Sequence, residues 1–156
     1  MRNFISEDDI EQAILQKLEG DPFQYGILRC DPSPDKRELL PDGTGRSSKK
    51  ECVLPLILRE ALARLNPDIP GEKLEEIARD LCRDFSATDM TATNYKYYNQ
   101  IRNGIKISLR RNGKEDFDFV KLVDFDRPEN NTFTAVSQMW IQGRVYWRRP
   151  DVLIFI

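Results

Sequence analysis

The chain has 156 residues, a formal net charge of −2 and a hydrophobic fraction of 40%, which indicate a globular domain without an overall basic surface for nucleic acid. It contains no histidine, which excludes serine–histidine catalysis, cysteine–histidine catalysis and histidine-ligated zinc within this segment. Its three cysteines are far apart, which is typical of reduced thiols in a cytoplasmic protein. We expect no signal peptide, because acidic residues follow the first residues at once, and no apolar run approaches the roughly 20 residues that span a membrane.

The first predicted element is a helix over about residues 7–19. Ser6 is a suitable N-cap, and Asp9, three residues later, can complete a capping box as its shorter partner. Ile5 and Ile10 occupy the two positions of a hydrophobic staple. Gly20 is expected to end the helix.

Two acids interrupt the apolar side of this helix. The apolar stripe consists of Ile10, Ile14 and Leu18, flanked by Ala13 and Leu15. Glu7 and Glu11 fall on the same side as the stripe. The helix dipole explains an acid in the first turn, which accounts for Glu7. Glu11 lies one turn further in, where a functional role and a structural ion pair explain it about equally well.

Residues 23–30 predict a strand, and residues 31–50 predict a long irregular loop rich in proline and glycine. Three basic residues of this loop could face DNA: Arg46, Lys49 and Lys50. The preferred interpretation is that they belong to a solvated loop.

Residues 51–104 form a helical section with helices predicted over about 52–66, 71–85 and 89–103. Apolar residues cover most of the first of these helices, so we expect it to be well buried. The second has a core stripe made of Leu74, Ile77, Ala78, Leu81 and Cys82. The tyrosines of the third could stack on bases, but helix aromatics more often lie in the core: Tyr95, Tyr97 and Tyr98.

Residues 105–156 form a strand-rich section. Strands over 105–110 and 117–125 are predicted to form a hairpin, with Asn112-Gly113 as its turn. Further strands are expected over 133–141, 145–147 and the last five residues. The coarse order is therefore a helix, a strand, three helices, and four or five mostly antiparallel strands.

The last strand, Val152–Ile156, is predicted to be buried on both faces because its five residues are all apolar. Asp151 lies at its start, and an unpaired buried charge would be costly there. An acid on the first helix, Glu11, and an acid at the start of this strand can meet at one point and form an oxygen site suited to Mg²⁺. Because the apolar run stops without a turn, we expect the chain to be the front part of a longer polypeptide.

Six segments, in order along nearly the whole chain, resemble one known family: Ser6–Glu11, Leu62–Pro67, Asn103–Gly104, Asp124–Phe133, Val136–Gln138 and Arg148–Ile156. The family is the N-terminal domain of the restriction (R) subunit of type I restriction–modification enzymes. That domain is similar to the restriction-endonuclease-like fold, an α/β (α+β) core with a mixed, mostly antiparallel sheet flanked by helices.

The resemblance implies a metal site with half of its residues in this chain. The signature of the fold is Pro-Asp, a spacer, then Asp/Glu-x-Lys. By this likeness Asp151 is the metal-binding aspartate and catalytic residue, and Glu11 is the helix acid that completes the Mg²⁺ shell. The Glu-x-Lys half is expected beyond Ile156, so residues 1–156 would form an incomplete nuclease-like domain that is inactive alone.

The resemblance also implies partners and a reaction. The partners are double-stranded DNA and the methyltransferase and specificity subunits of the restriction complex. The reaction is nonspecific cleavage of DNA after ATP-driven translocation by domains that lie beyond this segment. Arg148 and Arg149 are the candidate DNA contacts, and because neighbours on a strand face opposite sides, one of them is expected beside Asp151. The alternative is a catalytically inactive nuclease-like module that docks the subunit on its partners and guides DNA.

Overall fold

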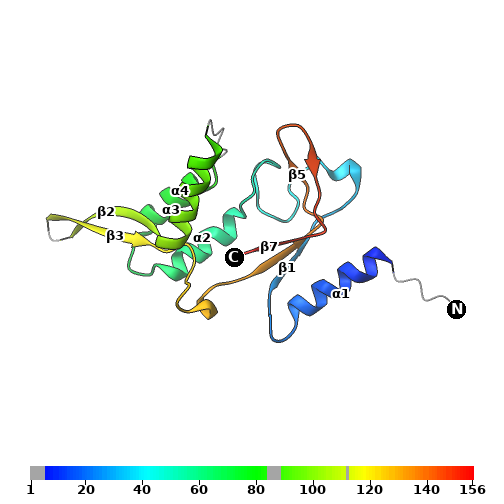
Figure 1. The fold of residues 1–156 in the computed structure, drawn as a ribbon, viewed down its shortest axis with the longest axis horizontal. Helices are drawn as coiled ribbons and strands as arrows, with labels where there is room; N and C mark the ends of the chain where they lie inside the picture. The colour runs from blue at the N-terminus through cyan, green and yellow to red at the C-terminus, as the bar shows by residue number, and fades with distance from the viewer. Residues whose placement is uncertain (1–5, 84–88, 112) are drawn as a thin grey trace. The chain divides into compact units, whose positions relative to one another are not determined.

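The computed structural model describes residues 6–83, 89–111 and 113–156, which form a mixed α/β protein (Figure 1). It divides into two compact units: unit 1 comprises Met1–Leu54 and Thr132–Ile156, and unit 2 comprises Pro55–Asn131. Unit 1 contains α1 (Glu7–Glu19), β1 (Gly26–Arg29), the 3-10 helix η1 (Pro34–Lys36), β4 (Thr134–Ser137), β5 (Ile141–Gln142), β6 (Trp147–Arg148) and β7 (Val152–Phe155). Unit 2 contains α2 (Pro55–Leu65), α3 (Gly71–Leu81), α4 (Met90–Asn103), β2 (Ile105–Arg111), β3 (Lys114–Val120) and the 3-10 helix η2 (Pro128–Asn130). The single domain expected over residues 1–156 stays a prediction.

Helix α1 begins with the predicted capping box. The Ser6 Oγ accepts a hydrogen bond from the backbone N–H of Asp9 at 3.1 Å, and the Ser6 backbone N–H donates to the Asp9 carboxylate at 2.9 Å. The side-chain hydrogen bond from Ser6, followed by its backbone hydrogen bond, lowers the pKa of the Asp9 carboxyl. The staple predicted between Ile5 and Ile10 lies outside the described residues, because Ile5 is not among them.

The buried side of α1 differs from the predicted stripe. Leu15 is fully buried, whereas Ile10 and Ile14 are 53% and 46% exposed. Glu11 is partly buried, as is Leu18. These three positions are spaced by four and three residues, so they share one side of the helix. The inward line therefore runs through Glu11, Leu15 and Leu18 instead of through Ile10 and Ile14.

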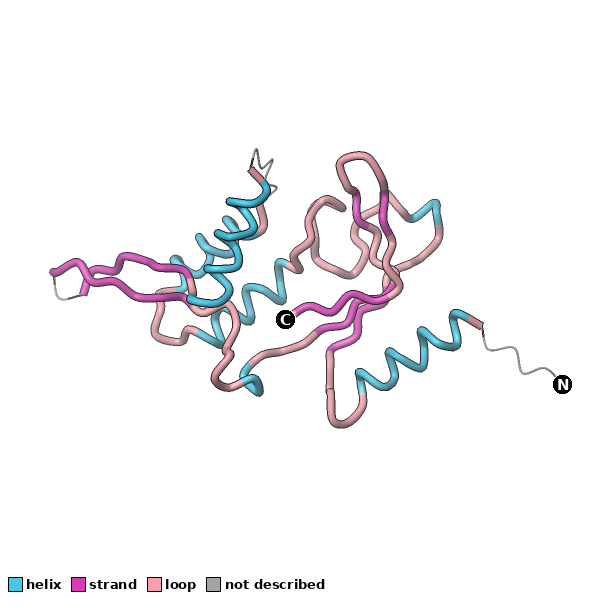
Figure 2. The backbone as a smooth tube through the Cα atoms, in the orientation of Figure 1, coloured by secondary structure: helices cyan, strands magenta, loops and turns pink. Residues whose placement is uncertain are grey.

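The sheet of unit 1 has the strand order β1–β4–β7, with β4 in the centre (Figure 2). β1 pairs with β4 in parallel, with Arg29 opposite Ser137. β7 pairs with the other side of β4 in the antiparallel direction, with Val152 opposite Ser137. All four residues of β4 are buried, as expected for a strand with neighbours on both sides. A separate two-stranded sheet, β5–β6, belongs to the same unit.

The final strand is not buried on both faces, so that prediction is wrong. Ile154 is 53% exposed, and Val152 and Leu153 are only partly buried. The reason is that β7 pairs with a single strand, β4, in the described part of the chain and lies at the edge of the sheet. The fully buried strand is Thr134–Ser137, in which two polar residues flank two apolar ones.

The loop after β1 contains a buried ion cluster that corrects the predictions for two of its basic residues. Arg46 and Lys49 are only 4% and 5% exposed, so they neither face DNA nor lie in solvent. Both donate to the same carboxylate oxygen of Asp42, at 2.7 Å each. This shared acid explains their burial, since buried cations need an anionic partner. Lys50 is exposed.

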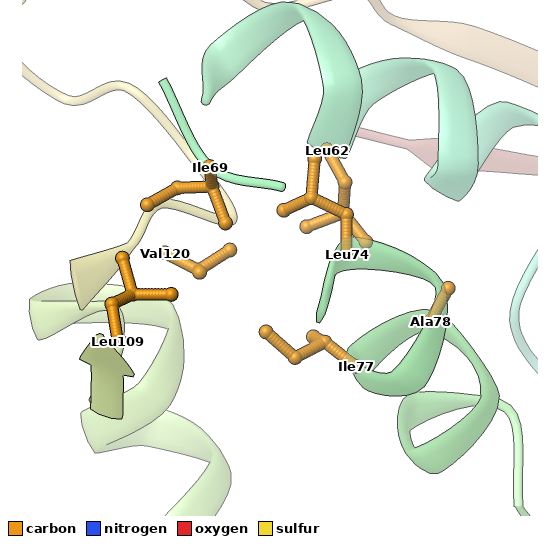
Figure 3. Packing of buried hydrophobic residues seen from close by; sticks show 7 residues of the cluster. All are labelled: Leu62, Ile69, Leu74, Ile77, Ala78, Leu109 and Val120. Atoms are coloured by element: carbon orange, nitrogen blue, oxygen red, sulfur yellow. The ribbon is translucent and has the colours of Figure 1, made fainter. Parts of the chain in front are cut away.

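Unit 2 has a hydrophobic core between α2, α3 and the antiparallel β2–β3 hairpin (Figure 3). The core residues are Leu62, Ile69, Leu74, Ile77, Ala78, Leu109 and Val120. The hairpin confirms the predicted pairing; Gly113 of its turn has a φ of +77°, and Asn112 lies outside the described residues. No helix in the described part of the chain is long and apolar enough to cross a lipid bilayer.

Two predictions for the helices of unit 2 are wrong. Helix α2 is not buried around its circumference, because Leu56 is 60% exposed and only Pro55 and Leu62 of this helix are buried. The tyrosines of α4 do not form a core, since Tyr95 and Tyr98 are 68% and 56% exposed. The core cluster draws on α2, α3 and the hairpin, and α4 contributes no buried residue to it.

The stripe of α3 is confirmed in Leu74, Ile77 and Ala78, which are buried. The predicted length of this helix, over residues 71–85, is wrong, because the helix ends at Leu81 with Cys82 as its C-cap.

Two polar side chains fasten the loops of unit 2. Asn66 donates to the carbonyl of Lys121 at 2.9 Å and accepts from the Lys121 backbone N–H at 2.7 Å. The Asp124 carboxylate accepts from the backbone N–H of Arg127 at 3.0 Å and from the side-chain amide of Asn130 at 3.0 Å. These hydrogen bonds give Asn66 and Asp124, which lie in two of the six family-like segments, a structural role.

Candidate functional site

A cleft of about 560 Å³ opens in unit 1 where β1 and β4 end and β7 begins. Its charged lining consists of Glu7, Asp8, Glu11, Arg29, Arg149 and Asp151. These residues come from the first turns of α1, the end of β1 and the start of β7, so opposite ends of the chain meet in one cleft. Four carboxylates and two guanidinium groups therefore surround a single solvent-filled space.

The sheet topology brings these ends together. β1 and β4 are parallel and finish at the same edge, where the Cys30 backbone N–H donates to the carbonyl of Ser137 at 3.1 Å. β7 runs the opposite way and starts at that edge, where the Gln138 backbone N–H donates to the carbonyl of Asp151 at 3.0 Å. Asp151 is thus held opposite Gln138 by the continuation of the β4–β7 ladder, and its side chain is exposed to the cleft.

Gln138 connects the strand side of the cleft to the helix side. Its side-chain amide Nε2 donates a hydrogen bond to the carboxylate of Glu11. Its backbone has a φ of +56°, the left-handed region that residues other than glycine seldom adopt. The amide therefore extends from the end of β4 toward α1, and one residue contacts both predicted site acids, Glu11 through its side chain and Asp151 through its backbone.

The two candidate arginines lie in different places. Arg149 lines the cleft, donates to the carbonyl of Pro32 at 2.8 Å and lies over the ring of Trp140, 5.2 Å from its centroid. Arg148 does not line the cleft, and its guanidinium lies 5.2 Å from the ring centroid of Tyr146. DNA contact by either residue stays a prediction, and the geometry favours Arg149.

The donor chemistry of the cleft fits a hard cation. Carboxylate and amide oxygens are suitable ligands for Mg²⁺, which usually takes one or two carboxylates and keeps several waters. Among the described residues, no group of three or more histidine, cysteine, aspartate or glutamate side chains converges on a common point. An ion held here would therefore take at most two of the four carboxylates of the described cleft as ligands, and Glu11 and Asp151 are the pair that the sequence predicts.

Cys30 also lines the cleft, but it is a poor candidate ligand. Its thiol donates to the carbonyl of Asp42 at 3.5 Å. Burial, followed by the negative charge of Asp42, raises the pKa of this thiol. Metal binding needs the thiolate, so the oxygen donors remain the candidate ligands.

The sequence-predicted site residues are brought together in part. Glu11, Asp151 and Arg149 line one cleft, as does Glu7, whereas Arg148 does not. The roles of Glu11 and Asp151 as metal ligands stay predictions. Gln138 is not among the predicted site residues, although it ends the family-like segment Val136–Gln138; its left-handed backbone and its place opposite Asp151 appear only in the fold.

Comparison with known proteins identifies relatives along nearly the whole chain. Over 153 residues, 97% of this chain, it is 29% identical to the type I restriction enzyme HindI endonuclease subunit of Haemophilus influenzae. Over 155 residues, 94% of the chain, it is 27% identical to a protein of Methanocaldococcus jannaschii described as a type I restriction enzyme MjaIXP endonuclease subunit. The match covers 14% of the length of each relative. No solved structure matches this chain.

A family of related sequences matches as well. The model of the family described as "type I restriction enzyme R protein N terminus" matches residues 4–156. This range includes unit 2, unit 1 from residue 4 onward, the cleft and all six segments on which the resemblance rests. The chain therefore belongs to the family of type I restriction enzyme R protein N-terminal regions.

Proposed function

We propose that this chain forms the front of a Mg²⁺-dependent endonuclease domain with a restriction-endonuclease-like core, in the R subunit of a type I restriction enzyme. The subunit would cleave double-stranded DNA without sequence preference, after ATP-driven translocation by domains beyond this chain. It would work with the methyltransferase and specificity subunits of the complex. Membership of the family supports the assignment to the R subunit, and the carboxylate-lined cleft supports the proposed Mg²⁺-dependent cleavage.

The observation that carries the proposal is that Glu11 and Asp151 line one cleft although 139 residues separate them in sequence (151 − 11 − 1). Surface acids of a chain with 26 Asp and Glu residues could lie anywhere, but these two interrupt apolar patterns and meet at the same sheet edge. A cleft of oxygen donors at the end of a sheet is suited to a divalent cation and a phosphate.

Each cleft residue has a defined task in this proposal. Asp151 and Glu11 provide carboxylate oxygens for the ion, and Arg149 lies within the cleft as a contact for a DNA phosphate. When bound, Mg²⁺ neutralises charge on the phosphate and makes a bound water more acidic. The lysine of the Asp/Glu-x-Lys pair would lie on a strand after β7 and stabilise charge on the phosphate in the transition state.

A second candidate function has an observation in its favour. No group of three or more potential ligand side chains converges among the described residues. A catalytically inactive, nuclease-like module that docks the subunit and guides DNA would have such an incomplete site permanently. The two functions differ in the strand after β7, which carries Asp/Glu-x-Lys only in the nuclease.

DNA cleavage tests the proposal in two proteins: the chain of residues 1–156 and the R subunit extended beyond it. We expect no cleavage by the shorter chain with Mg²⁺, because the lysine-bearing half of the site is absent. We expect the extended subunit to cleave DNA and Asp151→Asn to abolish this activity. Cleavage that survives Asp151→Asn would contradict the role of Asp151, and Mg²⁺-dependent nicking by residues 1–156 would contradict the placement of the missing residues.

A further inference from the structure

Gln138 makes contacts that no other described residue of the cleft combines. Its backbone N–H donates to the carbonyl of Asp151 at 3.0 Å, and its side-chain Nε2 donates to the carboxylate of Glu11. It belongs to the short buried turn that follows β4, where Ser137 is 3% exposed and Met139 is fully buried. Its backbone is therefore anchored on both sides, and its side chain extends from a fixed point.

The orientation of the Gln138 amide follows from its neighbour. A carboxylate only accepts hydrogen bonds, so the NH₂ group and not the carbonyl oxygen of the amide must face Glu11. This leaves Oε1 on the other side of the amide. Oε1 is buried and has no hydrogen-bond partner in the described part of the chain. A buried acceptor without a donor is unfavourable, so among the described residues the Gln138 side chain holds its contact with Glu11 at a cost in stability.

We propose that Gln138 is a positioning residue for the metal site, which holds Glu11 against the strand that carries Asp151. The inference rests on the proposed metal site of Glu11 and Asp151. Hydrogen bonds to the ligands of a metal orient these ligands and tune the affinity for the metal.

The chain offers a matched control for Gln138. Gln24 is the same residue type in the same left-handed conformation, with a φ of +52° against +56° for Gln138. Its Nε2 also donates to a carboxylate oxygen, that of Asp21, at 2.6 Å. Gln24 belongs to unit 1 but is exposed and does not line the cleft. Substituting either glutamine by glycine removes one amide–carboxylate contact and relieves one left-handed backbone to a similar extent.

The test measures the number and the affinity of bound Mn²⁺ ions by electron paramagnetic resonance. It uses the complete R subunit without nucleotide. The proteins are the wild type and the variants Asp151→Asn, Gln138→Gly, Gln138→Asn and Gln24→Gly. The binding lost in Asp151→Asn defines the site. We expect both Gln138 variants to weaken this site by about tenfold or more, since residues that orient metal ligands contribute this much to affinity. The Mn²⁺ concentration for half-maximal cleavage should rise by a similar factor, and Gln24→Gly should change neither quantity.

Thermal unfolding of the same variants separates positioning from folding. Glycine and asparagine both tolerate the left-handed conformation, so we expect unfolding midpoints of the Gln138 variants close to that of Gln24→Gly. Unchanged Mn²⁺ affinity in both Gln138 variants would overturn the inference and leave the metal site intact. Weaker binding that accompanies a large loss of thermal stability in both variants would also overturn it, because Gln138 would then act in folding. Mn²⁺ binding that is unchanged in Asp151→Asn would overturn the proposed function and this inference with it.

Discussion

Two aspartates of unit 1 have opposite environments. The Asp42 side chain is 8% exposed and accepts hydrogen bonds from Arg46 and Lys49, whose side chains are 0% and 4% exposed. Asp151 is exposed and lines a cleft in which three other carboxylates also lie. The oxygens of Asp42 are therefore filled by donors of the protein, whereas the Asp151 side chain stays accessible to solvent.

The electrostatics of the Asp42 cluster support this distinction. Burial alone would raise the pKa of the Asp42 carboxyl, but hydrogen bonds from Lys49, Thr44 and Arg46 outweigh it and hold the pKa far below its ordinary value. Arg46 also donates to the carbonyls of Glu51 and Trp140, at 3.0 Å each. The cluster therefore ties the loop after β1 to the segment between β4 and β5.

The largest expected effect comes from Asp151→Asn. Losing a metal-binding carboxylate removes several kcal/mol of transition-state stabilisation, which corresponds to about a thousandfold slower DNA cleavage by the R subunit. The free energy of unfolding should change by no more than about 0.5 kcal/mol, since the side chain is exposed. Cleavage assays and denaturant unfolding check both values. If Asp151→Asn lowers the free energy of unfolding as much as a substitution of Asp42 does, the contrast between the two aspartates is wrong.

Asp42→Asn should have the reverse profile. It leaves Arg46 and Lys49 buried without their anion, and breaking a buried ion pair costs about 3–5 kcal/mol. The measurement is the free energy of unfolding from urea denaturation. Glu75→Gln is the control, because the Arg59–Glu75 pair is 39% and 44% exposed and contributes about 0–1 kcal/mol. Equal losses for the two variants would show that Asp42 is not a buried anchor.

The acid dependence of stability should differ between these proteins. A carboxyl whose pKa is lower in the folded state stabilises the fold above its ordinary pKa of 3.8, and this contribution is lost as pH falls toward the folded value. The free energy of unfolding of the wild type should therefore exceed that of Asp42→Asn at neutral pH. This difference should shrink progressively below about pH 4. Unfolding curves at several pH values measure the difference. A difference in the free energy of unfolding between the two proteins that stays constant into acid would contradict the role of Asp42 as the charged partner.

The smallest expected effect concerns the two arginines. Arg149→Ala should weaken DNA cleavage while ATP hydrolysis continues, because Arg149 lines the cleft. It should also reduce the slope of log affinity against log salt by about one, as the loss of one phosphate contact does. Arg148→Ala is the matched control, since it removes the same charge next to the cleft. Equal effects of the two variants, or no effect of either, would refute the assignment to Arg149.

The sequence predicts local features of this fold better than long-range ones. The capping box of Ser6 and Asp9, the end of α1 and the β2–β3 hairpin depend on residues close in sequence, and all three are confirmed. The burial of Arg46 and Lys49 depends on how the loop folds back onto Asp42, and spacing alone does not reveal it. For this reason the sequence predicts solvent exposure for charged residues in a proline-rich loop.

The candidate site shows the same division. Glu11 and Asp151 stand out in the sequence because each interrupts an apolar pattern, and both line the cleft. Gln138 interrupts nothing, and its contacts exist only because β4 ends and β7 begins at the same edge. The burial of the last strand was overestimated because apolar composition gives no information on how many neighbours a strand has.

The most direct test of the central claim is iron-mediated cleavage of the protein chain. Fe²⁺ can replace Mg²⁺ at a carboxylate site, and with ascorbate and hydrogen peroxide it produces radicals that cut the backbone close to the ion. We predict cuts in the R subunit near Glu11, Gln138 and Asp151, which come from the two ends of this chain and line one cleft. Excess Mg²⁺ should suppress these cuts, and Asp151→Asn should remove them. Cuts that avoid these three positions, or that persist in Asp151→Asn, would contradict the claim that Glu11 and Asp151 hold one metal ion.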